Sequence, residues 1–322
     1  MTSHSVPAPD LPAVPGPRAP VLVVGSVGLD DVETPFGAVQ EELGGSSTFF
    51  SASASLFAPV RVVSVVGEDL AQDAFDFLAR RGVDLAGLAR LPGRTFRWAG
   101  RYGFDLNSRE TLRTELNVYG DFHPRLPDHY RRTPYVFLAN IHPALQIEVL
   151  QQVERGAFVA LDTMDFWIEV ARDALEAVLA RVDMVSLNDS EARELAGTPN
   201  LVTAARRIQN MGPRAVLIKK GEHGALCFNG DAVFFAPAYP LEEVRDPTGA
   251  GDVFAGGVMG YLAEQGGDPI AALRRAVIYG SAVASFAVED FGCRRLRTVQ
   301  RAEVEVRCRA FRAMTAVDGW EG

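Results

Sequence analysis

The strongest chemical signal in the sequence lies at residues 246–252, which read Asp-Pro-Thr-Gly-Ala-Gly-Asp. Small residues recur just after them, which predicts a tightly packed helix at residues 253–262. The turn formed by Gly249, Ala250 and Gly251 would then be the N-terminus of this helix. Free backbone N–H groups and the helix dipole make such a terminus an anion site, and glycine lets a phosphate approach the backbone closely.

Asp252 is unusual in a phosphate site, because a carboxylate beside a phosphate is unfavourable unless it takes part in the reaction. Accepting the proton of an attacking hydroxyl is such a part. The simpler alternative is a glycine-rich helix start in which Asp252 only favours the helix dipole. The order of residues 246–252 and the small-residue helix after them favour phosphoryl transfer, with Asp252 as general base and the backbone of Gly249 to Gly251 as anion hole.

The stretch DPTGAGDVFAGGVM resembles the C-terminal signature of the ribokinase-like (PfkB) family of carbohydrate and nucleoside kinases, and the likeness extends over roughly residues 20–315. The resemblance implies an α/β fold, with a doubly wound, mostly parallel sheet, helices on both faces and a small β lid. It implies transfer of the γ-phosphate of ATP to an alcohol group of a small-molecule substrate, with Mg²⁺. It also implies a monovalent cation, K⁺, near Asp246 and Thr248, and a homodimer that forms through the lids.

On the acceptor side, the resemblance rests on two stretches. Asp30, in GSVGLD, matches an acidic residue that contacts substrate hydroxyls in the family; read alone, it would be a turn residue. The stretch GGSST resembles the N-terminal signature and adds the substrate contacts Gly44, Gly45, Ser46 and Thr48. The chain departs from the family pattern at Gly28, Ser47 and Phe49, where Phe49 replaces the usual Asn. These departures argue against a ribose-like or fructose-like set of contacts.

On the nucleotide side, Asn188 and Glu191 match the N-x-x-E motif of the family, which implies that they organise Mg²⁺ and phosphate, largely through water. Alone, the same segment is a good helix start. One of the adjacent lysines Lys219 and Lys220 is expected to neutralise the nucleotide phosphates, and residues 281–292 resemble the helix and loop that flank the adenine. The expected ATP contacts are Asn188, Lys219, Gly221, Thr248, Gly249, Gly251 and Gly292.

Two segments are expected to form the lid, at about residues 33–42 and 94–120. The second is polar, aromatic and β-prone, which suits a small sheet that covers a site. An irregular surface excursion is the alternative. Arg97 and Arg101 are the substrate contacts expected from this segment. Asp162, which follows an apolar run, is a further expected substrate contact, with Trp167 near the mouth of the pocket.

The elements that would position these residues are legible as a regular rhythm. Short apolar runs predict buried strands at residues 21–25, 61–66, 135–138, 158–161, 184–187 and 215–218. Helices are expected at residues 70–81, 143–154, 169–181, 189–196 and 201–211. This alternation predicts a mostly parallel sheet covered by helices, which binds its ligands at the carboxyl ends of the strands.

The composition excludes several classes of protein. The net charge of −9 over 322 residues argues against a nucleic-acid partner, because such proteins usually carry a basic face. Three scattered cysteines favour buried thiols in a reducing cytoplasm over zinc or disulfides. Residues 1–19 lack the apolar core of a signal peptide and are expected to be a disordered tail. No apolar run is long enough for a membrane span, so a single cytoplasmic domain is expected at residues 20–318.

The expected acceptor is a sugar or a polyol such as inositol, because polar groups among the lid aromatics suit a polyhydroxylated ligand. A nucleoside kinase is the alternative, since Phe49 and the lid aromatics would stack on a base. A phosphosugar kinase would use Arg97, Arg101 and Arg109 as a basic pocket. The intact Asp252 disfavours a non-catalytic ligand-binding homologue. A nicotinamide dehydrogenase is disfavoured because GSVGLD lacks the G-x-G-x-x-G spacing.

Overall fold

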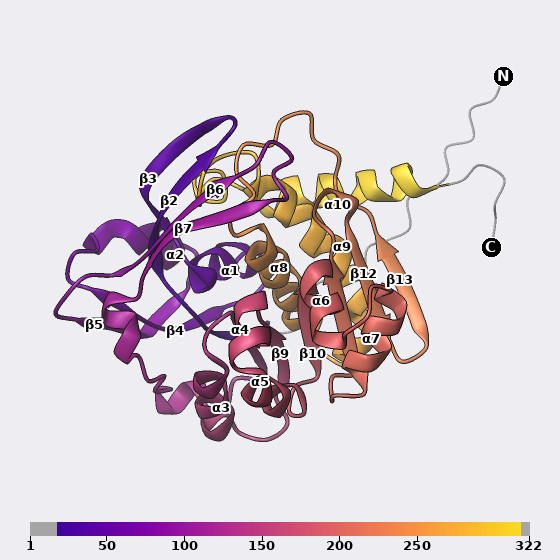
Figure 1. The fold of residues 1–322 in the computed structure, drawn as a ribbon, viewed down its shortest axis with the longest axis horizontal. Helices are drawn as coiled ribbons and strands as arrows, with labels where there is room; N and C mark the ends of the chain where they lie inside the picture. Colours follow the sequence, from indigo (N-terminus) through magenta and orange to yellow (C-terminus); the bar gives the residue numbers. More distant parts are fainter. Residues whose placement is uncertain (1–17, 317–322) are drawn as a thin grey trace.

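The computed structural model describes residues 18–316 and contains a nine-stranded sheet and a separate four-stranded sheet (Figure 1). The strands of the larger sheet are, in spatial order, β13 (Ala232–Ala236), β12 (Ala225–Asn229), β11 (Ala215–Lys219), β10 (Met184–Asn188), β9 (Phe158–Asp162), β8 (Tyr135–Leu138), β1 (Val21–Val24), β4 (Val60–Gly67) and β5 (Asp84–Leu91). Neighbours from β5 to β11 are parallel, and β12 and β13 are antiparallel additions. The predicted doubly wound, mostly parallel sheet is confirmed.

All six predicted strands are present, and three further strands were not predicted. The six share a run of fully buried apolar residues, which is why their positions are legible. By contrast, β5 and β13 are the two edges of the sheet and carry mostly half-buried or exposed residues. An edge strand needs little apolar sequence because one side and much of its surface face solvent, so the pattern that marks a buried strand is absent.

Helices cover both faces of the larger sheet, as two separate apolar cores show. One face carries α3 (Pro143–Gln152), α4 (Asp165–Val170), α5 (Arg172–Leu179), α6 (Asp189–Ala196) and α7 (Leu201–Gln209). The other carries α1 (Ser46–Ala54), α2 (Asp76–Arg80), α8 (Ala250–Gln265), α9 (Pro269–Ala287) and α10 (Arg301–Thr315). Short 3₁₀ turns are η1 (Gln72–Phe75), η2 (Asn117–Asp121), η3 (Asp128–Tyr130) and η4 (Gly221–His223).

Two predicted helices differ in detail from the observed ones. The helix expected at residues 169–181 is split at Ala171, whose φ of −136° interrupts the helical backbone between α4 and α5. The helix expected at residues 70–81 is η1 followed by the short α2, and Gly82 ends it with a positive φ of 76°. The helices α1 and α10 were not predicted, because α1 is rich in serine and α10 is strongly charged.

The order of the strands places a crevice beside β1. The chain runs outward from β1 through β4 to β5 and then returns to the other side of β1 at β8. The loops that leave β1 and β8 therefore diverge to opposite sides. In open α/β sheets such a reversal leaves a crevice at the carboxyl ends of the strands, which is where their ligands bind.

The small residues of α8 are explained by the close approach of two helices. A Cβ on Gly256 would lie 2.4 Å from the Phe50 carbonyl oxygen of α1, and a Cβ on Gly257 would lie 2.8 Å from the Gly280 Cα of α9. Both distances are shorter than real Cβ contacts allow. Glycine at these positions therefore lets α8 pack directly on the backbones of α1 and α9, and this packing sets where the N-terminus of α8 points.

The second sheet has the order β3 (Gly37–Gly44), β2 (Gly28–Thr34), β6 (Phe96–Tyr102) and β7 (Arg109–Glu115). Two hairpins that are far apart in sequence, β2–β3 and β6–β7, form it by the parallel pairing of β2 with β6 (Figure 1). Its first hairpin begins at Gly28, earlier than the expected segment. The sheet is tied to the body of the protein by the Glu42–Arg294 ion pair, at 2.6 Å.

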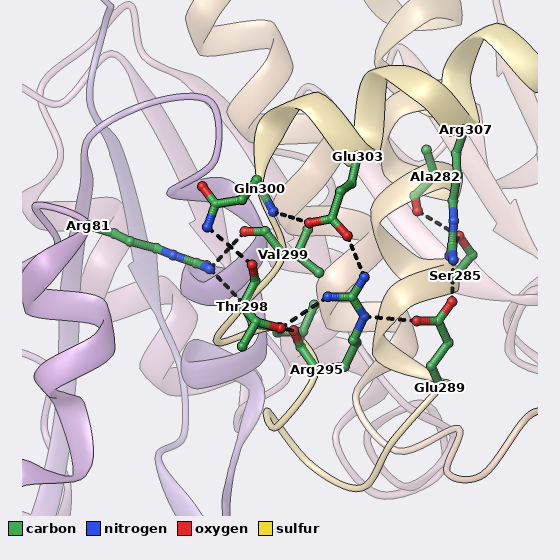
Figure 2. Close-up of polar contacts among 11 residues, drawn as sticks. Arg81, Ala282, Ser285, Glu289, Arg295, Thr298, Val299, Gln300, Glu303 and Arg307 are labelled. Atoms are coloured by element: carbon green, nitrogen blue, oxygen red, sulfur yellow. Dashed lines mark hydrogen bonds and ion pairs between the residues drawn. The ribbon is translucent and has the colours of Figure 1, made fainter.

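The last described helix, α10, is fastened by a polar network (Figure 2). The guanidinium of Arg295 donates to Glu289 at 3.0 Å and to Glu303 at 2.6 Å, and Arg307 also binds Glu289. Arg81, from the segment after α2, donates to the carbonyl oxygens of Leu296 and Val299. These contacts hold the loop between α9 and α10 against both helices and against the distant α2.

Both ends of the described chain bear on earlier expectations. Of the expected tail at residues 1–19, residues 1–17 lie outside the described range. Arg18 and Ala19 contact α8, through an Arg18–Glu264 ion pair at 3.2 Å and a backbone hydrogen bond. Within residues 18–316, α9 is long and apolar enough to cross a membrane by length and composition alone, and 56% of that stretch is buried inside the fold. Sequence inspection did not single it out because Arg274 and Arg275 interrupt its apolar residues.

The substitution Gly256→Ala is expected to destabilise the protein by about 1–3 kcal/mol, the usual cost of overpacking a core. The added methyl group collides with the backbone of α1, which cannot rotate away as a side chain can. Chemical denaturation measures the change. Gly120→Ala is the control, since a Cβ there meets only ordinary contact at 3.6 Å. Equal stability of both variants would contradict the packing described for α8.

Candidate active site

A cavity of about 1040 Å³ opens at the carboxyl ends of the central strands. Its walls come from the loops that follow β1, β8 and β9, from the β6–β7 hairpin and from the N-terminus of α8. The cavity lining includes Ser26, Asp30, Gly45, Ser46, Phe49, Trp98, Tyr102, Arg109, Asn140, His142, Met164, Phe166, Trp167, Thr248, Gly249 and Asp252. The cavity therefore lies in the crevice that the strand order predicts, and the four-stranded sheet forms one of its walls.

Within the described chain, the N-terminus of α8 carries unpaired backbone N–H groups at the edge of the cavity. Gly249 precedes the helix with a left-handed φ of 73°, and no side chain caps the helix. The Ala250 N–H donates to the Pro247 carbonyl at 3.2 Å. Among residues 18–316, no protein acceptor pairs with the N–H groups of Gly251 and Asp252, the second and third helical residues. These two amides are the free donors that a helix N-terminus offers to an anion.

Phe49, the departure from the family pattern noted above, packs against this turn. A Cβ on Gly249 would lie 2.4 Å from the Phe49 ring. Phe49 therefore lies flat against the glycine and lines the cavity beside it. A larger residue at position 249 would be excluded by both the ring and the left-handed backbone.

Asp246 joins this turn to the loop after α9. Its Oδ1 accepts the Thr248 N–H at 2.8 Å, and its Oδ2 accepts the Gly292 N–H at 3.1 Å. The side chain is fully buried, and burial raises its pKa. The Thr248 hydroxyl donates to the Tyr102 hydroxyl of β6 at 3.2 Å. The turn is thus held from below by Asp246 and touched from above by the four-stranded sheet.

Lys219, at the end of β11, supplies positive charge beside the free amides. Its Nζ lies 2.8 Å from Asp162 Oδ2 and 3.2 Å from where a Cβ on Gly251 would stand. Burial alone would lower the pKa of Lys219, but Asp162 and Glu191 outweigh it and raise that pKa. Lys219 therefore stays charged. Of the two adjacent lysines, it is the one that reaches the N-terminus of α8.

Asn188 and Glu191 form a capping box at the start of α6. Asn188 Oδ1 accepts the Glu191 N–H at 2.8 Å, and Glu191 Oε2 accepts the Asn188 N–H at 2.7 Å. Burial raises the pKa of Glu191 to about 7. In the described part of the chain, no three His, Cys, Asp or Glu side chains are grouped to hold a metal ion directly. The pair is thus arranged first as a helix start.

Two acidic side chains face the cavity in a largely dry setting. Burial raises the pKa of Asp252 to about 7, and Asp162 adds to the rise while Lys219 and Arg109 oppose it. Burial also raises the pKa of Asp30 to about 8, with further contributions from Asp246 and Asp252. Asp30 lies against the backbone of Gly44, where a Cβ would collide with its carboxylate at 1.9 Å. Both groups therefore exchange protons near neutral pH.

Several expected site residues lie outside the cavity lining. Arg97 binds Asp69 at 3.1 Å and also Glu41, so its guanidinium fastens the four-stranded sheet. Arg101 is exposed and pairs with Glu33 at 3.0 Å. The Thr48 hydroxyl is buried beneath the cavity, on α1. Asp162 reaches the site through Lys219, and Gly292 through Asp246.

Gly221 lies against the β6–β7 hairpin. A Cβ on Gly221 would stand 2.7 Å from Asn107 Oδ1, at the tip of that hairpin. The tip of the hairpin therefore touches the loop after β11, while its strands contribute Trp98, Tyr102 and Arg109 to the cavity. This contact joins two expected parts of the site that are far apart in the sequence.

Sequence reasoning passed over the residues that follow β8. Asn140 and His142 line the cavity, and the only signal for them is their position after a buried strand of a parallel sheet. Trp167, expected near the mouth of the pocket, also lines the cavity. Arg109, noted only for a phosphosugar, lines the cavity and lies over the Trp98 ring at 5.6 Å. No acidic side chain in residues 18–316 pairs with it within salt-bridge distance.

The raised pKa of Asp252 predicts how the Asp252→Asn variant changes stability with pH. A carboxyl whose pKa is raised on folding loses stability as pH rises from about 4 to about 7, because the unfolded chain ionises first. The amide has no such loss. We expect the melting temperatures of the variant and the wild type to be similar at pH 4, and the variant to melt higher at pH 8. A gap that is absent at pH 8 would contradict the buried carboxyl.

Comparisons with known proteins identify the family of this chain. The profile of the pfkB family carbohydrate kinases matches residues 137–299. A cytidine kinase of Thermococcus kodakarensis is 31% identical over 251 residues, which is 75% of this chain and 88% of the relative. The structure of a Burkholderia thailandensis nucleoside kinase in complex with inosine superposes with a TM-score of 0.74 at 20% identity, covering 90% of this chain and 97% of the other.

A third likeness is to the Arabidopsis thaliana ribokinase complexed with ribose and ATP. It has a TM-score of 0.72 at 22% identity and covers 90% of this chain and 99% of the other. At these identities the two solved structures establish the fold alone. The family profile and the cytidine kinase, which span half of the chain or more, establish the family. The chain is therefore a member of the pfkB family of carbohydrate kinases, phosphotransferases whose acceptor is an alcohol group.

Proposed function

We propose that this protein is an ATP-dependent nucleoside kinase, which transfers the γ-phosphate of ATP to a ribose hydroxyl. The observation that carries this proposal is the cavity, which is large and has an aromatic wall. That wall comprises Trp98 and Trp167, which are far from Asp252 in the sequence. Pockets for drug-sized ligands span roughly 300–1,000 Å³, and this cavity, at about 1040 Å³, lies just above that range. It exceeds what a single sugar ring requires.

The lining of the cavity supports a ligand with one polar and one aromatic part. Asp30, Asp252 and the Gly45 backbone supply the hydrogen-bonding groups that suit sugar hydroxyls. Trp98 and Trp167 supply aromatic surface on which a base stacks. The likeness to a cytidine kinase over most of the chain supports the same acceptor class. The sugar or polyol that the sequence placed first would leave the aromatic part of the cavity unfilled.

The proposed mechanism assigns the proton transfer to Asp252. The carboxylate accepts the hydroxyl proton as the hydroxyl oxygen bonds to phosphorus and the bond to ADP breaks. A pKa of about 7 suits this role, because the group is ionised in a useful fraction of molecules yet still basic. Asp30 is proposed to orient the sugar through its hydroxyls.

Charge on the moving phosphoryl group is proposed to meet three donors. The free N–H groups of Gly251 and Asp252 point from the start of α8, and the Lys219 ammonium lies beside them. Such preorganised donors stabilise charge as it develops. Asp162 holds Lys219 in place. Arg109 would approach from the four-stranded sheet, where it already lowers the pKa of Asp252.

The residues on the nucleotide side fit a hydrated metal ion. Bound Mg²⁺ would supply charge that neutralises the β- and γ-phosphates. The side chains of Asn188 and Glu191 are bonded to each other's backbone, so they would hold such an ion through water. Both oxygens of Asp246 accept backbone N–H groups. A monovalent cation near Asp246 and Thr248 would therefore bind to their remaining lone pairs.

The four-stranded sheet is proposed to act as the lid. Two observations support this role: Tyr102, Trp98 and Arg109 of the sheet line the cavity, and Tyr102 accepts a hydrogen bond from Thr248 at 3.2 Å. A closed lid excludes water, which suppresses hydrolysis of ATP and strengthens the electrostatic interactions inside.

Asp252→Asn is expected to keep nucleotide binding and lower kcat by about 10²–10⁴-fold, the scale of a positioned general base. Steady-state kinetics with the best acceptor measures kcat, and nucleotide titration by calorimetry confirms that the donor still binds. Asp231→Asn, an exposed change on the loop between β12 and β13, is the control. Unchanged kcat in Asp252→Asn would remove Asp252 from the mechanism.

An ADP-release screen over nucleosides, free sugars, polyols and sugar phosphates tests the acceptor class. The aromatic wall predicts that a nucleoside has the highest kcat/KM, at least about tenfold above free ribose, since stacking on an aromatic side chain contributes about 1–3 kcal/mol. A hexose, inositol or sugar phosphate that exceeds every nucleoside would overturn the proposal in favour of that class.

A further inference from the structure

The side-chain amide of Asn140 has a fixed orientation. The indole Nε1–H of Trp167 donates to Asn140 Oδ1 at 2.9 Å. An indole N–H only donates, so the oxygen must face Trp167 and the NH₂ group must face away. The Asn140 Nδ2 lies 3.2 Å from the sulfur of Met164. Thioether sulfur is a weak acceptor, so the amide keeps N–H capacity for a stronger partner.

The Trp167 indole that orients Asn140 is itself held on both sides. The His142 ring packs against it at 4.9 Å and the Phe166 ring at 4.8 Å, both edge to face. Asn140 and His142 lie between β8 and α3, and Trp167 lies in α4, just after the adjacent strand β9; all three line the cavity. We call these three residues the Asn140 wall. It contains none of the groups assigned to proton transfer or to phosphate.

His142 adds a second donor to this wall. Its Nδ1 accepts the Ala144 N–H at 3.1 Å, as the cap of α3. An accepting Nδ1 carries no proton, so in the neutral ring the proton is on Nε2. The Asn140 wall therefore offers N–H donors from two side chains, while the Asn140 oxygen is already engaged by Trp167.

We propose that Asn140, positioned by Trp167, determines which base this enzyme accepts, and that it selects cytosine over uracil. This inference rests on the proposed nucleoside kinase function. Cytosine carries two adjacent acceptors, O2 and N3. Uracil has the same O2, but its N3 carries a hydrogen and donates. Two donors on the wall match the cytosine edge and oppose the N3–H of uracil, which leaves polar groups unpaired.

The test compares cytidine with uridine in the wild type and in Asn140→Asp. The substitution keeps an oxygen for the Trp167 N–H but replaces the NH₂ donor by an acceptor. We expect kcat/KM for cytidine to fall by about 10- to 100-fold, the effect of leaving a polar partner unpaired, while uridine changes less or improves. Asn210→Asp, the same substitution at the C-cap of α7 and outside the cavity, should leave the cytidine-to-uridine ratio unchanged.

Turnover of free ribose separates reading of the base from general damage. The ratio of cytidine turnover to free-ribose turnover should therefore fall in Asn140→Asp, because ribose has no base to meet the wall. Trp167→Phe keeps Asn140 but removes the N–H that orients it. It should bring the cytidine-to-uridine ratio of kcat/KM toward one, because the Asn140 amide is then free to rotate and exchange the places of its oxygen and NH₂ group.

The outcomes are distinguishable. If the wild type phosphorylates no nucleoside, the proposed function fails. If nucleosides react but uridine or a purine nucleoside exceeds cytidine in the wild type, the base assignment is overturned. If cytidine is preferred and Asn140→Asp leaves the ratio unchanged, the nucleoside kinase stands and the role of Asn140 is overturned.

Discussion

Several carboxylic acids are buried or half-buried around the cavity, and much of the surrounding structure compensates for them. Burial is the largest cause of the raised pKa values of Asp30, Asp162, Glu191, Asp246 and Asp252. A buried carboxylate is tolerable only with hydrogen bonds or an opposite charge. Backbone N–H groups satisfy Asp246, Lys219 neutralises Asp162, and the capping box satisfies Glu191. Asp252 is the least directly paired of these side chains, so its carboxylate remains available to another molecule.

The glycine contacts of α8 explain how this arrangement is held rigid. Because α8 rests on the backbones of α1 and α9, its first turn cannot tilt without disturbing two other helices. Phe49 of α1 presses on Gly249 at that turn, and Asp246 connects it to the loop after α9. The charged network of Figure 2 in turn holds the loop that runs from α9 to α10. An anion site made of backbone amides is only as well placed as the helix that carries it.

How much of this was predictable depends on whether a residue's role is local. The buried strands and the start of α8 were predictable, because an apolar run and a glycine spacing each depend only on residues that are close together in the sequence. Edge strands such as β5 and the serine-rich α1 were not, because tertiary packing overrides their weak local preference. Arg97 and Arg101 were predicted to contact the ligand, yet they form ion pairs with Asp69 and Glu33. Those acidic partners are distant in sequence, and so is Trp167, which gives Asn140 its orientation.

The contact between Gly221 and the hairpin tip at Asn107 has a thermodynamic consequence. The strands of that hairpin line the cavity, and its tip rests on the loop beside Lys219. The hairpin and the loop cannot move closer together without one displacing the other, because their surfaces already touch. If binding of one substrate strengthens this contact, the free energy gained must also increase the affinity for the other substrate. Linkage requires this effect to be reciprocal, so the donor would strengthen acceptor binding by the same factor by which the acceptor strengthens donor binding.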